Sequence, residues 1–364
     1  MASIRVLIAG GGTGGHIIPA LAVARELVDR YDADVLFVGT PRGLELKLVP
    51  DAGFKLRLVN IGPLNSVPWM TRLKTVLQLP RAISDCKRLM REFQPGAVLG
   101  VGGYASGPAL AAALKLKLPT MVFEPNAMPG MANRMVGHKV KAAAVNFPVA
   151  APWFSNCQVT GIPVRPEFFS LPDPYPDKPH LLVFGGSQGA RILNNHVPPV
   201  IAKLLDAVPG LTVLHQSGTR HAQVTEASYL ASGADPSRWE VRPYIDDMPA
   251  CFGRASLVMS RAGASTVAEL AAAGRPALLV PFAAAADGHQ KRNAEAMVGA
   301  GAAVMLNEWD LDVQGRLLET LTNLLNDQAQ LQAMSLAART QAHPDAADRI
   351  ARKLVELAQA GKNS

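Results

Sequence analysis

The feature that most constrains the fold is one pattern that occurs twice in the chain. Residues 4–16 (IRVLIAGGGTGGH) and 180–191 (HLLVFGGSQGAR) each join a short apolar run to a glycine-rich turn and the start of a helical pattern. Short apolar runs without polar alternation are typical of strands that are buried on both faces of a parallel sheet. The repeated pattern therefore predicts two α/β domains, each opening with a strand, a glycine turn and a helix.

Further apolar runs alternate with helical patterns through both halves. Strands are expected at 4–9, 35–38, 97–101 and 120–123 in the first half, and at 181–184, 211–215, 256–260 and 277–281 in the second. Helices are expected at 19–30 and from 192 onward. This alternation is typical of Rossmann-like domains, in which helices cover a parallel sheet.

The length of the chain agrees with two domains. It has 364 residues, which is about twice the usual size of a single domain. A loop-like segment at 161–166 (GIPVRP) separates the halves. We therefore expect Rossmann-like domains at 1–162 and 163–341, and a C-terminal segment, 342–364, whose helical pattern could pack back across the linker.

Composition excludes some classes of protein and leaves others open. The chain is 49% hydrophobic and 18% charged, which suits a core-rich α/β protein better than a disordered one. A net charge of +7 suits nucleic acid, an anionic membrane or phosphorylated substrates, and does not choose among them. Its three cysteines are widely separated and form no zinc or disulfide pattern. No apolar stretch approaches the ~20 residues that span a bilayer, so we expect a protein that is soluble or lies on a membrane.

Three glycine-rich loops follow predicted strands, at 10–16, 100–108 and 185–191. A glycine turn that leads into a helix presents free backbone N–H groups and the positive helix end to an anion. The loops therefore predict a phosphate or diphosphate ligand. A dinucleotide site is disfavoured because the second strand ends in Val38-Gly39-Thr40, without the required acidic residue. No Gly-Lys-Ser/Thr loop of an ATPase is present.

Six motifs in a fixed order make the prediction more specific. They are GGTGGH (11–16), GGYASGP (102–108), EPNAMPGMANR (124–134), GGSQGAR (185–191), SRAGASTVAELAAAGRPALLVPF (260–282) and HQKRNA (289–294). Together they resemble the MurG family, the lipid I N-acetylglucosaminyltransferases of peptidoglycan synthesis. The resemblance covers nearly the whole chain, from about Gly11 to Ala294. It implies a GT-B fold, with two Rossmann-like domains and a cleft between them.

The resemblance also implies a reaction and a location. The C-terminal domain would bind UDP-GlcNAc, and the N-terminal domain would bind lipid I, the undecaprenyl-diphosphate-linked MurNAc-pentapeptide. A single displacement that inverts the anomeric centre would give lipid II, without a cofactor or a metal ion. The enzyme would be peripheral, on the cytoplasmic face of the bacterial inner membrane, where other cell-wall synthesis proteins could contact it. A related epimerase, a diacylglycerol glycosyltransferase and a non-catalytic nucleotide-binding scaffold remain alternatives with the same fold.

The family pattern assigns individual residues to the two substrates. Contacts with the acceptor diphosphate are assigned to Gly12, Gly14, Gly15, Gly102, Gly103 and Tyr104. Contacts with the donor are assigned to Thr13, Gly14, Gly15, Asn126, Arg165, Ser187, Ile245, Ala264, Ser265, Thr266, Glu269 and Gln290. Glu269 would accept hydrogen bonds from two ribose hydroxyls; alternatively, it only complements the dipole of its helix. The chain departs from the family pattern at Phe123, Pro125 and the apolar run 283–286.

Two residues are candidates for the catalytic base. His16 closes the first glycine loop and has a pKa range suited to proton transfer, although a lone histidine is often structural. Glu124, at the end of another predicted strand, is the second candidate; its alternative role is to brace loops through hydrogen bonds. The sequence leaves the choice open.

The segment 61–92 could contact the membrane. It places Trp69, Met70, Leu73 and Leu77 at roughly helical spacing, interleaved with lysines and arginines. Such a segment suits an interface with anionic lipid, whereas the simpler interpretation is an amphipathic helix that covers the sheet. Nucleic acid is not expected as a partner, because the segment lacks the aromatic interleaving of a stacking surface.

Overall fold

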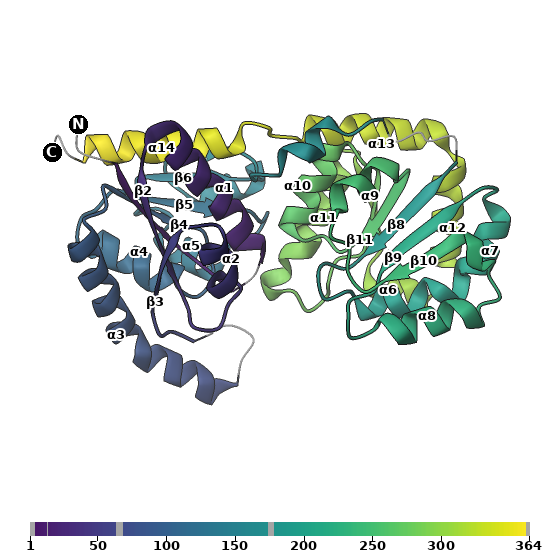
Figure 1. Cartoon of the computed structure of the whole chain (residues 1–364), viewed down its shortest axis with the longest axis horizontal. Coiled ribbons are helices and arrows are strands. Elements are labelled where there is room, and N and C mark those ends of the chain that lie inside the picture. The colour runs from purple at the N-terminus through teal and green to yellow at the C-terminus, as the bar shows by residue number, and fades with distance from the viewer. Residues whose placement is uncertain (1–3, 13, 63–67, 174–177, 362–364) are drawn as a thin grey trace. The chain divides into compact units, whose positions relative to one another are not determined.

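The computed structural model describes residues 4–12, 14–62, 68–173 and 178–361 (Figure 1). The chain divides into two compact units, which are described separately below. The first unit comprises Met1–Pro163 and His343–Ser364, and the second comprises Val164–Ala342. Each unit is built on one parallel sheet.

The first unit contains a seven-stranded sheet in the order β3-β2-β1-β4-β5-β6-β7. Its strands are β1 (Arg5–Ala9), β2 (Asp34–Gly39), β3 (Lys55–Leu58), β4 (Ala97–Gly100), β5 (Thr120–Glu124), β6 (Ala142–Val145) and β7 (Cys157–Val159). The order reverses between β1 and β4, so the chain leaves these neighbours in opposite directions. Ligands of doubly wound sheets bind at the carboxyl ends of strands beside such a reversal.

Helices of the first unit cover this sheet. They are α1 (Gly14–Tyr31), α2 (Glu45–Asp51), α3 (Trp69–Phe93), α4 (Ser106–Lys115), α5 (Met131–Val136) and α14 (Ala346–Ala360), with a 3-10 helix, η1, at Pro148–Trp153. On one face, α3 and α4 pack together over a core that includes Leu7, Leu36 and Val98. The buried Cys86 belongs to this core, and burial raises the pKa of its thiol to about 12.

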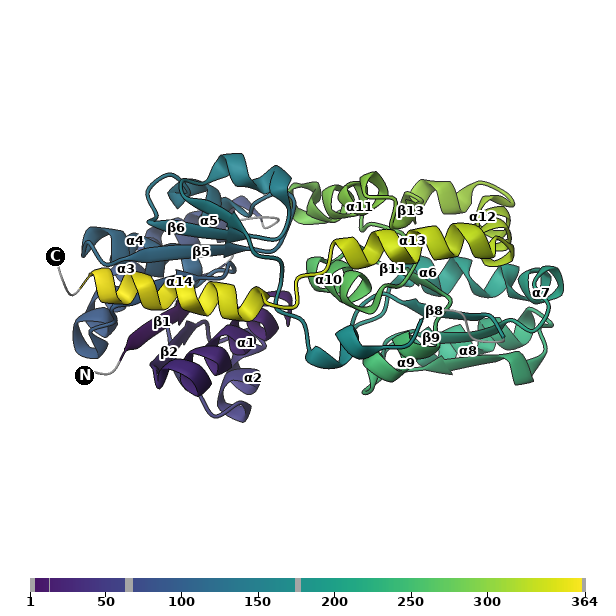
Figure 2. The same cartoon turned by 90° about the horizontal axis from the view of Figure 1, so that it is seen from above.

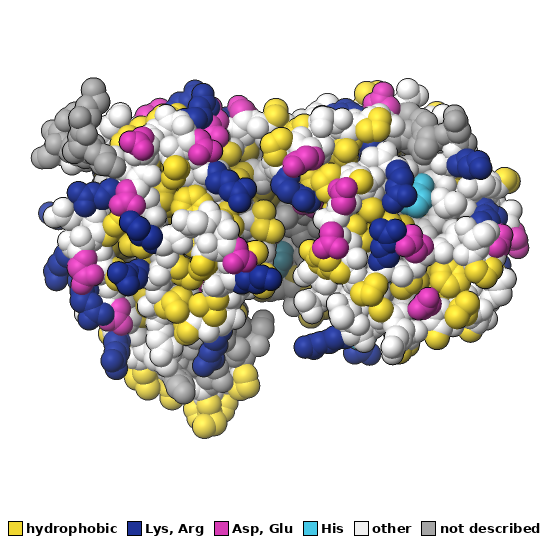
Figure 3. Space-filling model, viewed as in Figure 1, with side chains coloured by type: hydrophobic (Ala, Val, Ile, Leu, Met, Phe, Trp, Pro, Cys, Tyr) yellow, Lys and Arg dark blue, Asp and Glu magenta, His cyan; other side chains and the backbone are white. Residues whose placement is uncertain are grey.

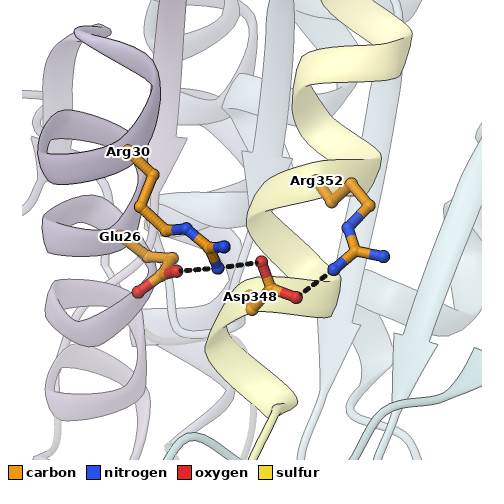
Figure 4. Close-up of polar contacts among 4 residues, drawn as sticks. All are labelled: Glu26, Arg30, Asp348 and Arg352. Carbon is orange, nitrogen blue, oxygen red and sulfur yellow. Dashed lines mark hydrogen bonds and ion pairs between the residues drawn. The ribbon is translucent and has the colours of Figure 1, made fainter.

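The helix α14 returns to the first unit after the whole of the second, and packs against α1, β1 and β4 (Figure 2). Its apolar face includes Ile350 and Leu354, which are fully buried. Around this contact, Asp348 pairs with Arg30 and Arg352 (Figure 4). Because exposed ion pairs contribute up to ~1 kcal/mol each, burial of the apolar face does most to hold α14 in place.

The second unit contains a six-stranded sheet in the order β10-β9-β8-β11-β12-β13. Its strands are β8 (His180–Phe184), β9 (Thr212–Gln216), β10 (Trp239–Arg242), β11 (Leu257–Ser260), β12 (Ala277–Leu279) and β13 (Ala303–Met305). The order again reverses beside the first strand of the unit, between β8 and β11. Both glycine loops of the repeated sequence pattern therefore follow a strand at a reversal point.

The helices of the second unit complete its α/β architecture. They are α6 (Arg191–His196), α7 (Pro198–Ala207), α8 (Ala222–Ala231), α9 (Met248–Arg254), α10 (Ala264–Ala273), α11 (His289–Gly299), α12 (Arg316–Asn326) and α13 (Gln328–Thr340). Short 3-10 helices lie at η2 (Pro166–Ser170), η3 (Pro236–Arg238), η4 (Ala286–Gly288) and η5 (Glu308–Asp312). The core includes Leu181, Val183 and Leu257 from the sheet, and Leu321 and Leu324 from α12.

Two expectations from the sequence need correction. The helix expected at 19–30 begins at Gly14, so Gly14, Gly15 and His16 are helical and the first loop is shorter than expected. The strand expected at 277–281 ends at Leu279. Among the described residues, no helix is both long enough and apolar enough to cross a membrane.

Candidate functional site

The first two glycine loops meet at the carboxyl ends of β1 and β4. A Cβ atom built on Gly10 would lie 2.2 Å from Val101 Cγ2, and one built on Gly103 would lie 2.1 Å from the carbonyl oxygen of Gly11. Only glycine permits backbones to approach this closely. The structure therefore brings together the candidate acceptor residues Gly12, Gly102 and Gly103, with the half-exposed Tyr104 beside them.

His16 lies in the first turn of α1, after Gly14 and Gly15. Its ring packs over the second loop: a Cβ atom on Gly102 would lie 2.8 Å from His16 Cε1. The first backbone N–H groups of a helix have no partner within the helix and can bind an anion. His16 and this N–H cluster therefore occupy the same end of α1. The donor candidate Thr13 lies outside the described residues.

A buried carboxylate that the sequence did not single out lies beneath the first loop. Glu45, the first residue of α2, is fully buried. Its Oε2 accepts the N–H of Gly12 at 2.8 Å, and its Oε1 accepts the backbone N–H and the hydroxyl of Thr40, both at 2.9 Å. The Gly12 N–H, expected to face a diphosphate, instead binds a carboxylate of the protein.

Glu124 is the last residue of β5 and is also buried. Its carboxylate accepts the backbone N–H groups of Asn126 at 3.0 Å and Gly130 at 2.9 Å. It also accepts the side-chain amides of Asn126 at 3.2 Å and Asn133 at 3.0 Å. Burial raises the pKa of Glu124, and these hydrogen bonds oppose that shift. The carboxylate thus holds the loop 125–130 on β5.

In the second unit, the third glycine loop forms a tight turn after β8. The N–H of Gly189 donates to the carbonyl oxygen of Gly186 at 2.9 Å, and the exposed Ser187 lies within this turn. A Cβ atom on Gly189 would lie 1.8 Å from the carbonyl oxygen of Ser217, so the loop packs directly on the end of β9. The structure thereby presents Ser187 at the carboxyl end of the sheet.

Gln216, the buried last residue of β9, joins this loop to the segment after β10. Its Nε2 donates to the carbonyl oxygen of Gly186 at 2.9 Å, and its Oε1 accepts the N–H of Ile245 at 2.8 Å. The N–H of Ile245 is thus engaged within the protein, while its side chain is buried. The sequence did not single out Gln216; its only signal is a polar residue at the end of a buried strand.

The α10 helix carries four further candidates. Ala264 is its first residue, followed by Ser265 and Thr266 in the first turn and by Glu269 one turn later. Within the described part of the chain, Ser265 Oγ is buried and has no hydrogen-bond partner. Burial raises the pKa of the partly covered Glu269, and the nearby cation of Arg165 lowers it by a smaller amount. The resulting pKa is about 7. Polar groups of α10 are therefore left available at its N-terminal end.

Gln290 and Arg165 complete the donor candidates in the second unit. Gln290, in the first turn of α11, accepts the N–H of Phe282 on its Oε1 at 3.0 Å. Its oxygen is therefore used to hold the loop that precedes the helix. Arg165 is exposed, and its guanidinium lies 5.1 Å from the ring centroid of Phe168.

Comparison with known proteins identifies the family. Residues 6–145 match the glycosyltransferase family 28 N-terminal domain, and residues 180–350 match its C-terminal domain. A protein of an Anaeromyxobacter species is 44% identical over 361 residues, which cover 97% of this chain and 93% of the relative. Its name is UDP-N-acetylglucosamine–N-acetylmuramyl-(pentapeptide) pyrophosphoryl-undecaprenol N-acetylglucosamine transferase. The chain belongs to the MurG family.

Solved structures agree with this assignment. The crystal structure of Acinetobacter baumannii MurG superposes with a TM-score of 0.82 at 31% identity, covering 97% of this chain and 99% of that one. A calicheamicin glycosyltransferase, at 17% identity and a TM-score of 0.69, shares the fold. The MurG family and the GT-B fold predicted from the sequence are both confirmed.

Proposed function

We infer that the chain transfers N-acetylglucosamine from UDP-N-acetylglucosamine to lipid I and thereby forms lipid II in peptidoglycan synthesis. The observation that carries this conclusion is the 44% identity, over 97% of the chain, with a transferase named for that reaction. The chain is therefore a UDP-GlcNAc-dependent N-acetylglucosaminyltransferase.

For the donor, we propose that the second unit holds the UDP moiety. The turn at Ser187 and the first turn of α10 offer hydroxyl and N–H groups to the diphosphate. The buried hydroxyl of Ser265, with no partner among the described residues, supports this assignment. Glu269 would accept the two ribose hydroxyls. Since helix N-termini stabilise the negative charge that develops on departing UDP, this arrangement needs no metal ion to do so.

For the acceptor, we propose that the first unit binds the lipid-linked diphosphate. The first-turn N–H groups of Gly14 and Gly15, the second loop at Gly102 and Gly103, and Tyr104 would contact it. The occupied N–H of Gly12 argues against a direct contact there. The acceptor hydroxyl would attack the anomeric carbon while a base removes its proton, and the C–O bond to UDP would break on the opposite face.

We propose His16 as this base. Glu124 already accepts four hydrogen bonds that hold its own loop, so removing a proton would require breaking part of that network. The His16 ring lies at the meeting point of the two loops proposed for the acceptor. Glu124 would then act as the brace that the sequence left as its alternative role.

We further propose that the N-terminal end of α3 contacts the cytoplasmic face of the inner membrane. The exposed fractions of Trp69, Met70 and Leu77 are 74%, 68% and 72%, which is unusual for such large apolar side chains. Figure 3 shows yellow, apolar side chains gathered at the lower end of the first unit, at this end of α3. Arg81 and Arg88 are exposed farther along the helix and would face anionic headgroups.

Flotation with vesicles tests the membrane contact. Trp69→Ala with Leu77→Ala should lower binding to vesicles that contain anionic lipid, while donor affinity stays unchanged. Leu230→Ala, which removes an equally large and 60% exposed side chain from the second unit, is the matched control. Equal binding of the double variant and the control would exclude α3 as the contact.

The reaction itself is tested with purified protein and radiolabelled UDP-GlcNAc, with and without lipid I. We expect release of UDP that depends on lipid I, together with label in a disaccharide lipid. Release of UDP without labelled lipid, or transfer to another acceptor, would contradict the proposed function.

A further inference from the structure

The carboxylate of Glu45 is a buried ionisable group to which the proposed reaction gives no role. Its surroundings are built to fit it: Cβ atoms on Gly11 and Gly43 would lie 2.2 and 1.8 Å from its carboxylate oxygens. A Cβ atom on Gly39 would lie 2.6 Å from its Cγ. Two loop glycines and Gly39, the last residue of β2, thus leave the space that this one side chain fills.

The hydrogen bonds of Glu45 are not those of an ordinary buried ion pair. Among the described residues, no lysine or arginine pairs with it, and its partners are two backbone N–H groups and one hydroxyl. Burying a carboxylate without a cation is unfavourable unless hydrogen bonds compensate it. An apolar side chain of similar size would fill the space, but would leave the N–H groups of Gly12 and Thr40 unpaired.

The backbone that Glu45 holds leads directly to the proposed base. Gly12 has a φ of +94°, so this part of the loop is set in a left-handed conformation. On one side of the loop, Gly12 binds Glu45; on the other, the Gly11 carbonyl abuts Gly103. His16 follows within five residues, with its ring over Gly102. A shift at Gly12 therefore changes where His16 lies relative to the second loop.

We propose that Glu45 is the positioning residue of the acceptor site. Its carboxylate clamps the first glycine loop, and so fixes His16 and the first turn of α1 against Gly102 and Gly103. Because the carboxylate already occupies the Gly12 N–H, the acceptor diphosphate is left to the first turn of α1 and the second loop. This inference rests on the proposed use of these loops by the acceptor.

Kinetics of Glu45→Ala separate positioning from donor binding. We expect kcat/KM for lipid I to fall roughly 100-fold, because a displacement of about 1 Å can have that effect. The dissociation constant for UDP should stay within about twofold of the wild-type value, since the proposed UDP contacts lie in the second unit.

Formate should restore part of the activity of Glu45→Ala, because it can enter the vacated space and accept the same N–H groups. It should not activate Glu45→Gln, in which that space is filled.

Two further variants control for folding. Glu45→Gln preserves the volume but turns an amide NH2 toward one of the three donors, so kcat/KM for lipid I should fall roughly tenfold. Thr40→Val removes only the hydroxyl bond and keeps both backbone bonds to Glu45; we expect it to lower the melting temperature slightly and to leave kcat/KM within about twofold. Equal kinetic losses in Thr40→Val and Glu45→Gln would show loosened packing and overturn the proposal.

Amide hydrogen exchange tests the clamp independently of turnover. In Glu45→Gln, the segment containing Gly12 should exchange faster than in the wild type, while the segment containing Gly186 should be unchanged. Wild-type protein that fails to use lipid I would contradict the proposed function, and the exchange experiment would still decide the clamp. Folded Glu45 variants with wild-type kinetics, or with unchanged exchange at Gly12, would overturn the proposal.

Discussion

The first and third glycine loops have the same backbone pattern but different supporting side chains. Both follow the first strand of their unit, and both contain a glycine with a φ near +90°, Gly12 at +94° and Gly186 at +89°. Under the first loop, the Glu45 carboxylate accepts an N–H group. Under the third, the neutral amide of Gln216 donates to a carbonyl oxygen. One support uses up a donor and adds negative charge; the other uses up an acceptor and adds none.

This difference indicates how one motif can serve two substrates. A loop that rests on a neutral amide keeps its N–H groups for an anion, which suits the departing diphosphate of the donor. A loop that rests on a carboxylate is already occupied by a negative charge and is better suited to placing the side chain that follows it. Glycine loops that look alike in the sequence can therefore differ in which of their N–H groups remain available to an anion.

If the first loop places a base and the third binds the leaving group, His16→Ala should affect only the chemical step. We expect kcat to fall by about 10²- to 10⁴-fold, the usual contribution of a general base, with unchanged affinity for UDP. Steady-state kinetics and calorimetry measure the two effects. His138→Ala, at an exposed position of the same unit, is the control. A large loss of UDP affinity in His16→Ala would contradict the division of roles.

Gln216→Glu makes the support of the third loop resemble that of the first. It places negative charge beneath the proposed diphosphate site and turns an oxygen toward the carbonyl of Gly186. We expect the dissociation constant for UDP to rise about 10- to 100-fold, as measured by calorimetry. Gln216→Met removes both hydrogen bonds of the amide, to Gly186 and from Ile245, without adding charge, and should still have a smaller effect. Equal losses of UDP affinity in both variants would show that the added charge does not explain the effect.

Glu269 provides a pH test of the donor side alone. Burial raises the pKa of its carboxyl group to about 7, so the group is largely protonated at pH 6 and ionised at pH 8. Only in the ionised form are both carboxylate oxygens of Glu269 unprotonated, so that each can accept a hydrogen bond from one ribose hydroxyl. Affinity for UDP-GlcNAc should therefore rise with pH, roughly tenfold from pH 6 to pH 8. Glu269→Gln should bind more weakly at pH 8 and show a flat profile; a wild-type slope in this variant would exclude Glu269.

The smallest effect is expected from alanine at the two left-handed glycines. A Cβ atom on Gly12 or Gly186 would meet no atom within 4 Å, so each substitution introduces backbone strain without a clash. Both variants should lose about 1 kcal/mol of unfolding free energy, measured by denaturant titration. In addition, Gly12→Ala should lower kcat, and Gly186→Ala should weaken UDP binding. Weaker UDP binding in Gly12→Ala, with a lower kcat in Gly186→Ala, would show that the roles of the two loops are exchanged.

Much of the fold was predictable, because buried parallel strands have a strong local signal. The strand beginning near Leu181 and those near Val35 and Thr120 lie where their apolar runs predicted them. The predicted start of α1, at Pro19, was wrong because the glycines before it and the proline itself disfavour a helix that begins earlier. Pro19 lies near the N-terminal end of α1, where it removes a single hydrogen bond, so packing of the helix overrides the local preference.

The supports of the candidate site were not predictable from local patterns. Glu45 lies 33 residues from Gly12, and Gln216 lies 30 residues from Gly186. Neither contact leaves a periodic or motif signal, because only the folded sheet brings the partners together. The sequence did find the groups on the loops themselves, such as His16 and Ser187, since these belong to continuous motifs.

The return of α14 to the first unit has a consequence for how the protein is made. Ile350 and Leu354 pack on β4, which is translated about 250 residues earlier, and on β1, which is translated about 340 residues earlier. The ribosome therefore completes the second unit before it delivers the helix that closes the first. During synthesis, the unit that is translated later is the first able to reach its final form. Until α14 is translated, the first unit exposes the apolar surface that this helix later covers, which is a target for chaperones on the nascent chain.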